Sequence, residues 1–151
     1  MKIVKFLVFM IFLCLIGVMI YFFIFSDSYQ KSMKARVEYY MGNYKEALTL
    51  ANEAYELDKY NKMAFSILTQ SKIAFKMIYF IDDANKYLKD IDQISQKENI
   101  TQSDRMKIKV ICNVMIERYK RLSPTILTDK DLYEKCTKYY QKFQKIEDEL
   151  F

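Results

Sequence analysis

The hydrophobic pattern of the chain begins with one long apolar run and then changes to a helical period. Residues 6–25, "FLVFMIFLCLIGVMIYFFIF", contain no charged side chain. About 20 such residues are needed to cross a bilayer, whereas the apolar region of a cleaved signal peptide spans roughly 7 to 15 residues and ends in small residues. Ile24, Phe25 and Ser26 provide no such cleavage site. Residues 1–27 are therefore predicted to form an uncleaved, single-pass transmembrane anchor.

After the anchor, apolar residues recur every three or four positions, as on one face of an amphipathic helix. A first helix is predicted to continue the anchor through "SYQKSMKARVEYY" and to end at Gly42 and Asn43. The apolar stripe of the next helix, residues 44–57, consists of Ala47, Leu48, Ala51, Ala54, Tyr55 and Leu57. "DKYN" then breaks the pattern, and Asn61 is the predicted N-cap of a third helix.

The remaining pattern predicts a third to a sixth helix. A joint near residues 79–82 separates the third helix from the fourth, and their stripes are Ala64, Phe65, Leu68 and Phe75, then Ala84, Leu88, Ile91 and Ile94. Thr101 and Asp104 predict the start of a fifth helix, Pro124 marks a break, and Thr128 is the predicted cap of the last helix. The stripes of these two helices are Ile108, Ile111, Cys112, Met115, Ile116 and Tyr119, then Leu132, Tyr133, Cys136, Tyr139, Tyr140, Phe143, Ile146 and Leu150.

Composition agrees with an all-α fold. The 151 residues suffice for one domain, residues 28–151, behind the anchor. Two glycines and one proline provide too little turn chemistry for a β-sandwich or a nucleotide-binding α/β fold. The prediction is a transmembrane helix followed by about three antiparallel helix hairpins.

Small residues stand at fixed offsets in "MGNYKEALTLANEAYELDKYN", residues 41–61. This stretch resembles a tetratricopeptide repeat (TPR), a helix-turn-helix unit of about 34 residues. The resemblance lies in the pattern Gly-x-Tyr-x-x-Ala, a second small residue and an Asp-x-x-Asn turn. The matching positions are Gly42, Tyr44, Ala47, Ala54, Asp58 and Asn61. Lys59 stands where the family has proline, and Ala51 where it has a larger residue. The resemblance implies a TPR-like solenoid, with residues 28–97 repeat-like and residues 101–151 a divergent hairpin; the alternative is a generic antiparallel helical bundle.

The same resemblance implies a partner-binding face, because repeats of this family generally bind peptides or partner helices on the face that their first helices form. The residues that would line it are Ser32, Arg36, Tyr39, Ser66, Gln70 and Ile73. The alternative is an ordinary solvated surface.

Charge bears on the location of the chain. Lys2 and Lys5 nearly balance Lys31, Lys34 and Arg36 across the anchor, but the short, basic, acid-free N-terminus resembles a secretory n-region. We therefore expect an inner-membrane protein with a cytoplasmic N-terminus and a periplasmic helical domain. The 24 basic and 19 acidic residues leave a mild excess that does not indicate a nucleic-acid partner.

The sequence contains few of the residues and motifs that enzymes use for catalysis. The chain has no histidine, no glycine-rich phosphate loop and no closely spaced cysteines, so no enzyme activity, metal, cofactor or small-molecule substrate is predicted.

Cys112 and Cys136 lie symmetrically about Pro124 on the stripes of the last two helices. If these helices run antiparallel, the two thiols face each other and could form a disulfide in an oxidising compartment; the alternative is two buried reduced thiols.

The resemblance and the anchor together predict a scaffold or adaptor that mediates protein–protein interaction in a bacterial cell-envelope complex, such as a flagellar motor or a secretion assembly. Two alternatives remain: an envelope chaperone or assembly factor that holds exported clients, and a permanent structural subunit of a large membrane complex.

Overall fold

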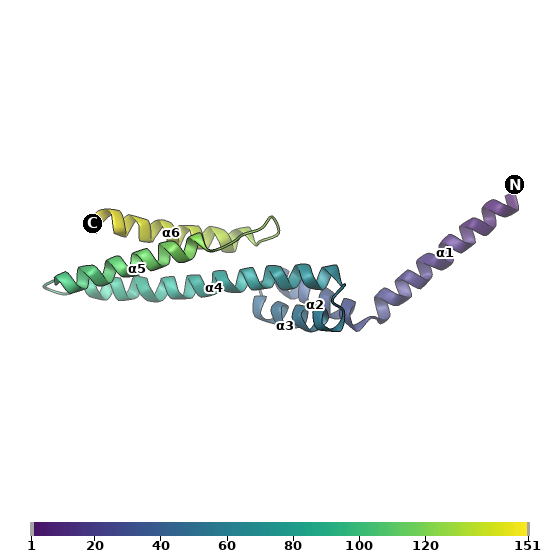
Figure 1. Cartoon of the computed structure of the whole chain (residues 1–151), viewed down its shortest axis with the longest axis horizontal. Helices are drawn as coiled ribbons and strands as arrows, with labels where there is room; N and C mark the ends of the chain where they lie inside the picture. The colour runs from purple at the N-terminus through teal and green to yellow at the C-terminus, as the bar shows by residue number, and fades with distance from the viewer. Residues whose placement is uncertain (1, 151) are drawn as a thin grey trace. The chain divides into compact units, whose positions relative to one another are not determined.

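The structure, a computed structural model, describes residues 2–150, and it describes the side chains of residues 4–21 and 26–150. Over these residues it contains six helices and no strand (Figure 1), so the predicted all-α class is confirmed. The helices are α1 Lys2–Phe25, α2 Asp27–Tyr40, α3 Tyr44–Leu57, α4 Lys62–Ser95, α5 Gln102–Lys120 and α6 Lys130–Leu150.

The chain divides into two compact units, Met1–Ser71 (unit 1) and Lys72–Phe151 (unit 2). The border falls inside α4, because the first turns of this helix pack within unit 1 and the remainder within unit 2. The division expected from the sequence, at residues 97–101, instead assigns the whole of α4 to the repeat-like part.

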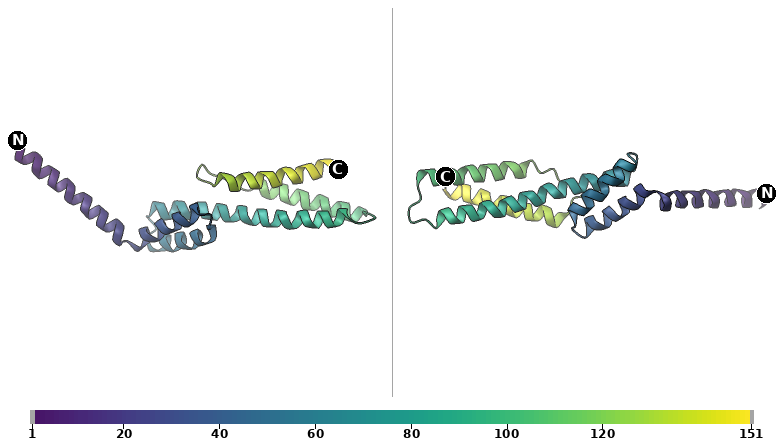
Figure 2. Two further views of the ribbon diagram at one scale, coloured as in Figure 1. Left: turned by 180° about the vertical axis from the view of Figure 1, so that it is seen from behind. Right: turned by 90° about the horizontal axis from the view of Figure 1, so that it is seen from below.

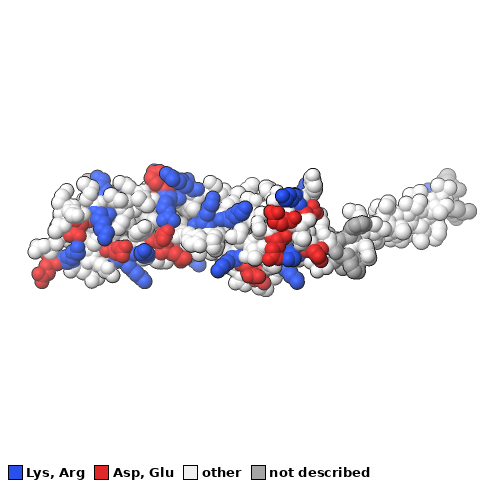
Figure 3. All heavy atoms as spheres, turned by 60° about the horizontal axis from the view of Figure 1, so that its bottom comes forward, with Lys and Arg blue, Asp and Glu red and all other residues white. Residues whose placement is uncertain are grey.

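Helix α1 is long and apolar enough to span a membrane. Over Val4–Tyr21 the mean hydropathy is 2.6, and no residue of this window is buried within the protein. Figure 3 shows an almost uncharged surface along the described part of this helix. The expectation that α1 continues unbroken into the next helix is wrong, because the backbone at Ser26 is extended, with φ −83° and ψ 112°, and α2 begins at Asp27.

Helix α4 is one continuous helix of 34 residues, so the predicted joint near residues 79–82 does not exist. Five helices therefore follow α1, where six were predicted, so these helices do not pair into three hairpins. Residues 62–95 contain neither glycine nor proline, so nothing in the backbone forces a break. The adjacent aspartates Asp82 and Asp83 lie on the helix surface: Asp82 is exposed, and Asp83 forms an ion pair with Arg118 at 2.6 Å.

Unit 2 contains a three-helix bundle, whose helices lie side by side in both views of Figure 2. Residues 72–95 of α4 run antiparallel to α5, and the rings of Phe80 and Tyr119 lie 6.0 Å apart. Helix α6 runs back along both: the Cys136 thiol donates to the carbonyl oxygen of Met77 at 3.7 Å, and the Tyr139 hydroxyl donates to Asn85 at 2.6 Å. The fully buried core side chains are Ala74, Met77, Phe80, Ala84, Cys112, Met115, Cys136 and Phe143.

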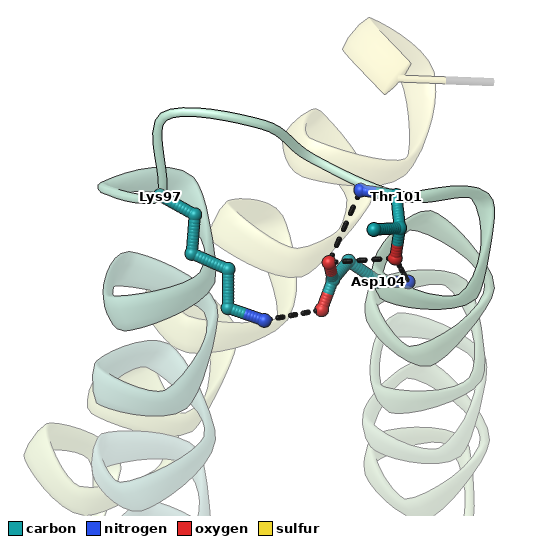
Figure 4. A network of polar contacts seen from close by, with 3 residues as sticks. All are labelled: Lys97, Thr101 and Asp104. Atoms are coloured by element: carbon teal, nitrogen blue, oxygen red, sulfur yellow. Dashed lines mark hydrogen bonds and ion pairs between the residues drawn. The ribbon is translucent and has the colours of Figure 1, made fainter.

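A capping box starts α5, as Thr101 and Asp104 predicted (Figure 4). The Asp104 amide donates to the Thr101 hydroxyl oxygen at 3.1 Å, and the Thr101 amide donates back to the Asp104 carboxylate at 3.1 Å. Lys97 adds an ion pair at 2.6 Å from the preceding turn. The cap of α6 differs from the prediction: Asp129 accepts from the Leu132 amide at 2.9 Å, whereas Thr128 closes the preceding turn.

Candidate functional site

The turn between α2 and α3 requires Gly42 for its backbone conformation. Gly42 has φ +83°, the left-handed region, and a Cβ there would meet no atom within 4 Å, so the requirement is conformational rather than steric. The Gly42 amide donates to the Tyr39 carbonyl at 3.1 Å, and the Asn43 amide donates to the Glu38 carbonyl at 2.9 Å. This pair of bonds is a Schellman motif, which satisfies the last carbonyls of α2 and turns the chain sharply into α3.

Small side chains let α3 approach its neighbours closely. Ala47, Ala51 and Ala54, spaced four and three residues apart on one face of α3, are all fully buried. At the start of this helix the buried ring of Tyr44 meets the ring of Tyr39 edge to face, with centroids 5.3 Å apart. Three of the predicted repeat-packing residues, Tyr44, Ala47 and Ala54, therefore lie in the core of unit 1.

Asn61 joins three helices through a buried polar network. Its side-chain oxygen accepts from the amides of Met63 and Ala64 at 3.0 and 3.1 Å, which caps α4. Its amide nitrogen donates to the hydroxyls of Ser28 at 2.9 Å and Ser32 at 3.3 Å on α2. Both donors and both acceptor positions of the amide group are thus occupied within the protein.

The network continues into α3 and is complete. The Ser28 hydroxyl donates to the Ala54 carbonyl near the end of α3 at 2.7 Å, and the Ser32 hydroxyl donates to the Tyr29 carbonyl at 3.0 Å. Asp58 closes the adjoining turn, since its carboxylate accepts from the Tyr60 amide at 2.9 Å. The Asp-x-x-Asn sequence therefore fixes how α3 leads into α4.

The six residues expected to form a partner-binding face do not form one surface. Ser32, Tyr39 and Gln70 are buried, Ser66 and Ile73 are half-buried, and Arg36 is exposed with its guanidinium 5.8 Å from the centre of the Tyr40 ring. The face of α2 that carries Ser28, Ser32, Ala35 and Tyr39 faces the interior of unit 1. Ile73 belongs to unit 2, whereas the other five residues belong to unit 1.

An apolar groove lies instead on another face of the α2–α3 hairpin. Met33 and Val37, one helical turn apart on α2, are 45 % and 48 % exposed, and Leu50 of α3 is half-buried beside them. The groove has a volume of about 460 Å³, and Lys34, Glu38 and Glu46 complete its lining. It is defined here as the α2–α3 groove. This groove was not predicted from the sequence, although Met33 and Val37, four residues apart on an otherwise polar face, were a visible signal.

Two polar contacts join the elements beside the α2–α3 groove. An ion pair between Lys31 and Glu53 joins the two helices, and Asn43 donates to the Glu38 carboxylate at 2.7 Å beside the turn. An apolar floor with charged rims is the composition that protein-docking surfaces show. The groove can therefore receive apolar side chains of a partner and orient them by charge.

Cys112 and Cys136 are free, fully buried thiols, so the bond that their placement about Pro124 would permit is not formed in the structure. Burial raises the pKa of each thiol to about 11, and for Cys112 the Glu147 carboxylate adds to the effect. Both act as small apolar core side chains. Within the described residues no cluster of three or more histidine, cysteine or carboxylate side chains could hold a metal ion.

No protein-family model, curated protein or solved structure matches the chain.

Proposed function

We propose that the chain is a membrane-anchored, TPR-like adaptor that docks a protein partner of the cell envelope in the α2–α3 groove. In this proposal α1 crosses the inner membrane with its N-terminus in the cytoplasm, and the helices that follow lie in the periplasm. The single observation that carries it is an exposed apolar groove in the same compact unit as an apolar helix of membrane-spanning length.

The local geometry favours the TPR-like interpretation over a generic bundle. The Schellman turn at Gly42, the alanine contact face and the Asp58–Asn61 turn each occupy the place that the repeat pattern assigns to them. One helix pair and the first turns of α4 make up this repeat-like part, in keeping with a short adaptor rather than a long solenoid.

A second candidate, a permanent structural subunit, is favoured by the large apolar side chains that unit 1 exposes outside the groove. Tyr60 is 93 % exposed, Tyr40 is 72 % exposed and Phe65 is 56 % exposed. A subunit that never leaves its complex would keep such residues covered. In this case the partner would remain bound through stringent washing, whereas an adaptor would exchange it.

The experiment compares what co-purifies with three forms of the full chain extracted in mild detergent. A carboxylate placed by Val37→Glu in the floor of the groove should abolish capture of the partner, because burying an unpaired charge is costly. The matched control is Asn52→Glu on the exposed face of α3, which should capture the partner like the wild type. Equal capture by all three forms would contradict docking in the groove, and release of the chain from membranes by an alkaline wash would contradict the anchor.

A further inference from the structure

The loop between α5 and α6 holds two large apolar side chains out in solvent. Ile126 is 97 % exposed and Leu127 is 62 % exposed. The loop is ordered around them: the Thr125 amide donates to the Thr128 hydroxyl oxygen at 2.8 Å, and the Thr128 amide donates to the Thr125 carbonyl at 3.0 Å. The buried side chain of Thr128 anchors this turn to unit 2. Ile126 and Leu127 remain exposed, and they are called the apolar tip.

A basic hollow lies at the start of this loop, where Arg121 and Leu122 follow the end of α5. It has a volume of about 440 Å³, and its lining consists of Lys76, Tyr79, Phe80, Arg118, Arg121 and Leu122. Arg118 is paired with Asp83 at 2.6 Å, whereas Lys76 and Arg121 form no ion pair with the residues that the structure describes. Ile126 follows Leu122 by four residues, so their α-carbons lie within about 14 Å of each other.

An apolar tip near a basic hollow is complementary to the surface of an anionic bilayer, which has an apolar acyl-chain region beneath a layer of negatively charged headgroups. Exposed apolar side chains gain from entering the boundary between headgroups and acyl chains, and each nearby lysine or arginine gains from negatively charged headgroups. The hollow offers the cationic groups of Lys76 and Arg121, neither of which forms an ion pair with the described residues, for a lipid phosphate. A protein pocket could accept the apolar tip, but it would not by itself account for the cationic hollow.

We propose that the α5–α6 loop is a second membrane contact, in which Ile126 and Leu127 enter the interface of an anionic bilayer while Lys76 and Arg121 bind a phospholipid headgroup. This inference rests on the anchor of the proposed function. An inserted α1 keeps unit 2 near a bilayer at high effective concentration, whatever the arrangement of the two units.

The experiment uses the full chain reconstituted into vesicles of phosphatidylcholine, with or without phosphatidylglycerol, that contain a nitroxide-labelled lipid. An environment-sensitive fluorophore is attached through Ser123→Cys in a Cys14→Ser background, which leaves the apolar tip intact; the buried Cys112 and Cys136 do not compete for the label. We expect a blue-shifted emission and strong quenching by the lipid nitroxide in vesicles with phosphatidylglycerol, and loss of most of this quenching without it.

Variants and control positions separate the contributions. I126S/L127S should abolish the quenching, whereas Leu57→Ser, which alters an exposed leucine of unit 1, should leave it unchanged. A label introduced by Glu98→Cys, in the α4–α5 loop at the other end of the bundle, should remain in water. A water-exposed Ser123 label in both kinds of vesicle, as a protein-binding loop would give, would overturn the inference, and so would equal quenching with and without phosphatidylglycerol.

A label on the native Cys14 of α1 distinguishes the two proposals. Quenching at Cys14 without quenching at Ser123 would refute the loop contact and leave the anchor standing. Absence of quenching at Cys14 would refute the anchor itself.

Discussion

The side-chain amide of Asn61 donates a hydrogen bond to the hydroxyl of Ser28 at 2.9 Å, and this bond joins the N-cap of α4 to the start of α2 across 33 positions of the sequence. Ser28 passes the connection to α3 through the Ala54 carbonyl. One buried asparagine therefore sets the relative placement of three helices in a unit whose core contains many alanines. The network adds directional contacts to a core of alanines and a few larger side chains, and such contacts favour one arrangement.

Asn61→Ala should destabilise unit 1 by about 2 kcal/mol, because it removes a helix cap worth roughly 1 kcal/mol and buried hydrogen bonds worth about the same. Ser28 and Ser32 keep their bonds to backbone carbonyls, so the loss should not be larger. Denaturation followed by circular dichroism, on the full chain in detergent, measures the change. The matched control is Asn52→Ala on the exposed face of α3, and equal stability of the two variants would show that the network contributes nothing.

The start of α5 should weaken in acid. The hydrogen bond from Lys97, followed by those from Thr101, lowers the pKa of Asp104 from 3.8 to about 2. A carboxylate with a lowered pKa stabilises the folded state above its unfolded pKa, and this stabilisation is lost as the pH falls from about 4 through about 2. Asp104→Asn should therefore reduce the fall in melting temperature between about pH 5 and about pH 2. Identical pH profiles for variant and wild type would contradict the assigned role.

Cys112 and Cys136 should resist alkylation in the folded protein, because both are buried and burial raises the pKa of each thiol to about 11. After unfolding without reductant, both should react fully, as free thiols do. Mass spectrometry of the intact chain counts the attached groups. A pair that stays protected until a reductant is added would reveal a disulfide, contradict the free thiols and favour export to an oxidising compartment.

The sequence predicts those parts of the fold that local signals specify. Helix ends were correctly predicted at three places. Two of them are caps formed by side chains, at Thr101 with Asp104 and at Asn61, and the third is Gly42, whose backbone adopts a positive φ. The joint predicted near residues 79–82 was wrong, because α4 continues through it as one helix. The absence of glycine and proline from residues 62–95 already favours a continuous helix, and the ion pair of Asp83 with Arg118 adds a tertiary contact at this point.

The candidate site was harder to predict because it depends on which face of α2 is covered. Ser32 and Tyr39 resemble surface residues in sequence, yet the Asn61 network and the Tyr44 ring bury them. Met33 and Val37 are apolar and would be expected inside, yet they line the exposed α2–α3 groove. A periodicity that contains few large apolar residues does not decide between two faces, so packing partners from α3 and α4 determine the outcome.

Site-specific photo-crosslinking at Val37 tests the central claim most directly. A photoreactive amino acid at this position in the full chain, expressed in its own membranes, should give one discrete crosslinked product with a protein partner. The same amino acid at Asn52, on the exposed face of α3, should give none. A discrete product at Val37 alone is the result that a membrane-anchored adaptor with a docking groove predicts; absence of any product at Val37, or equal products at both positions, would contradict it.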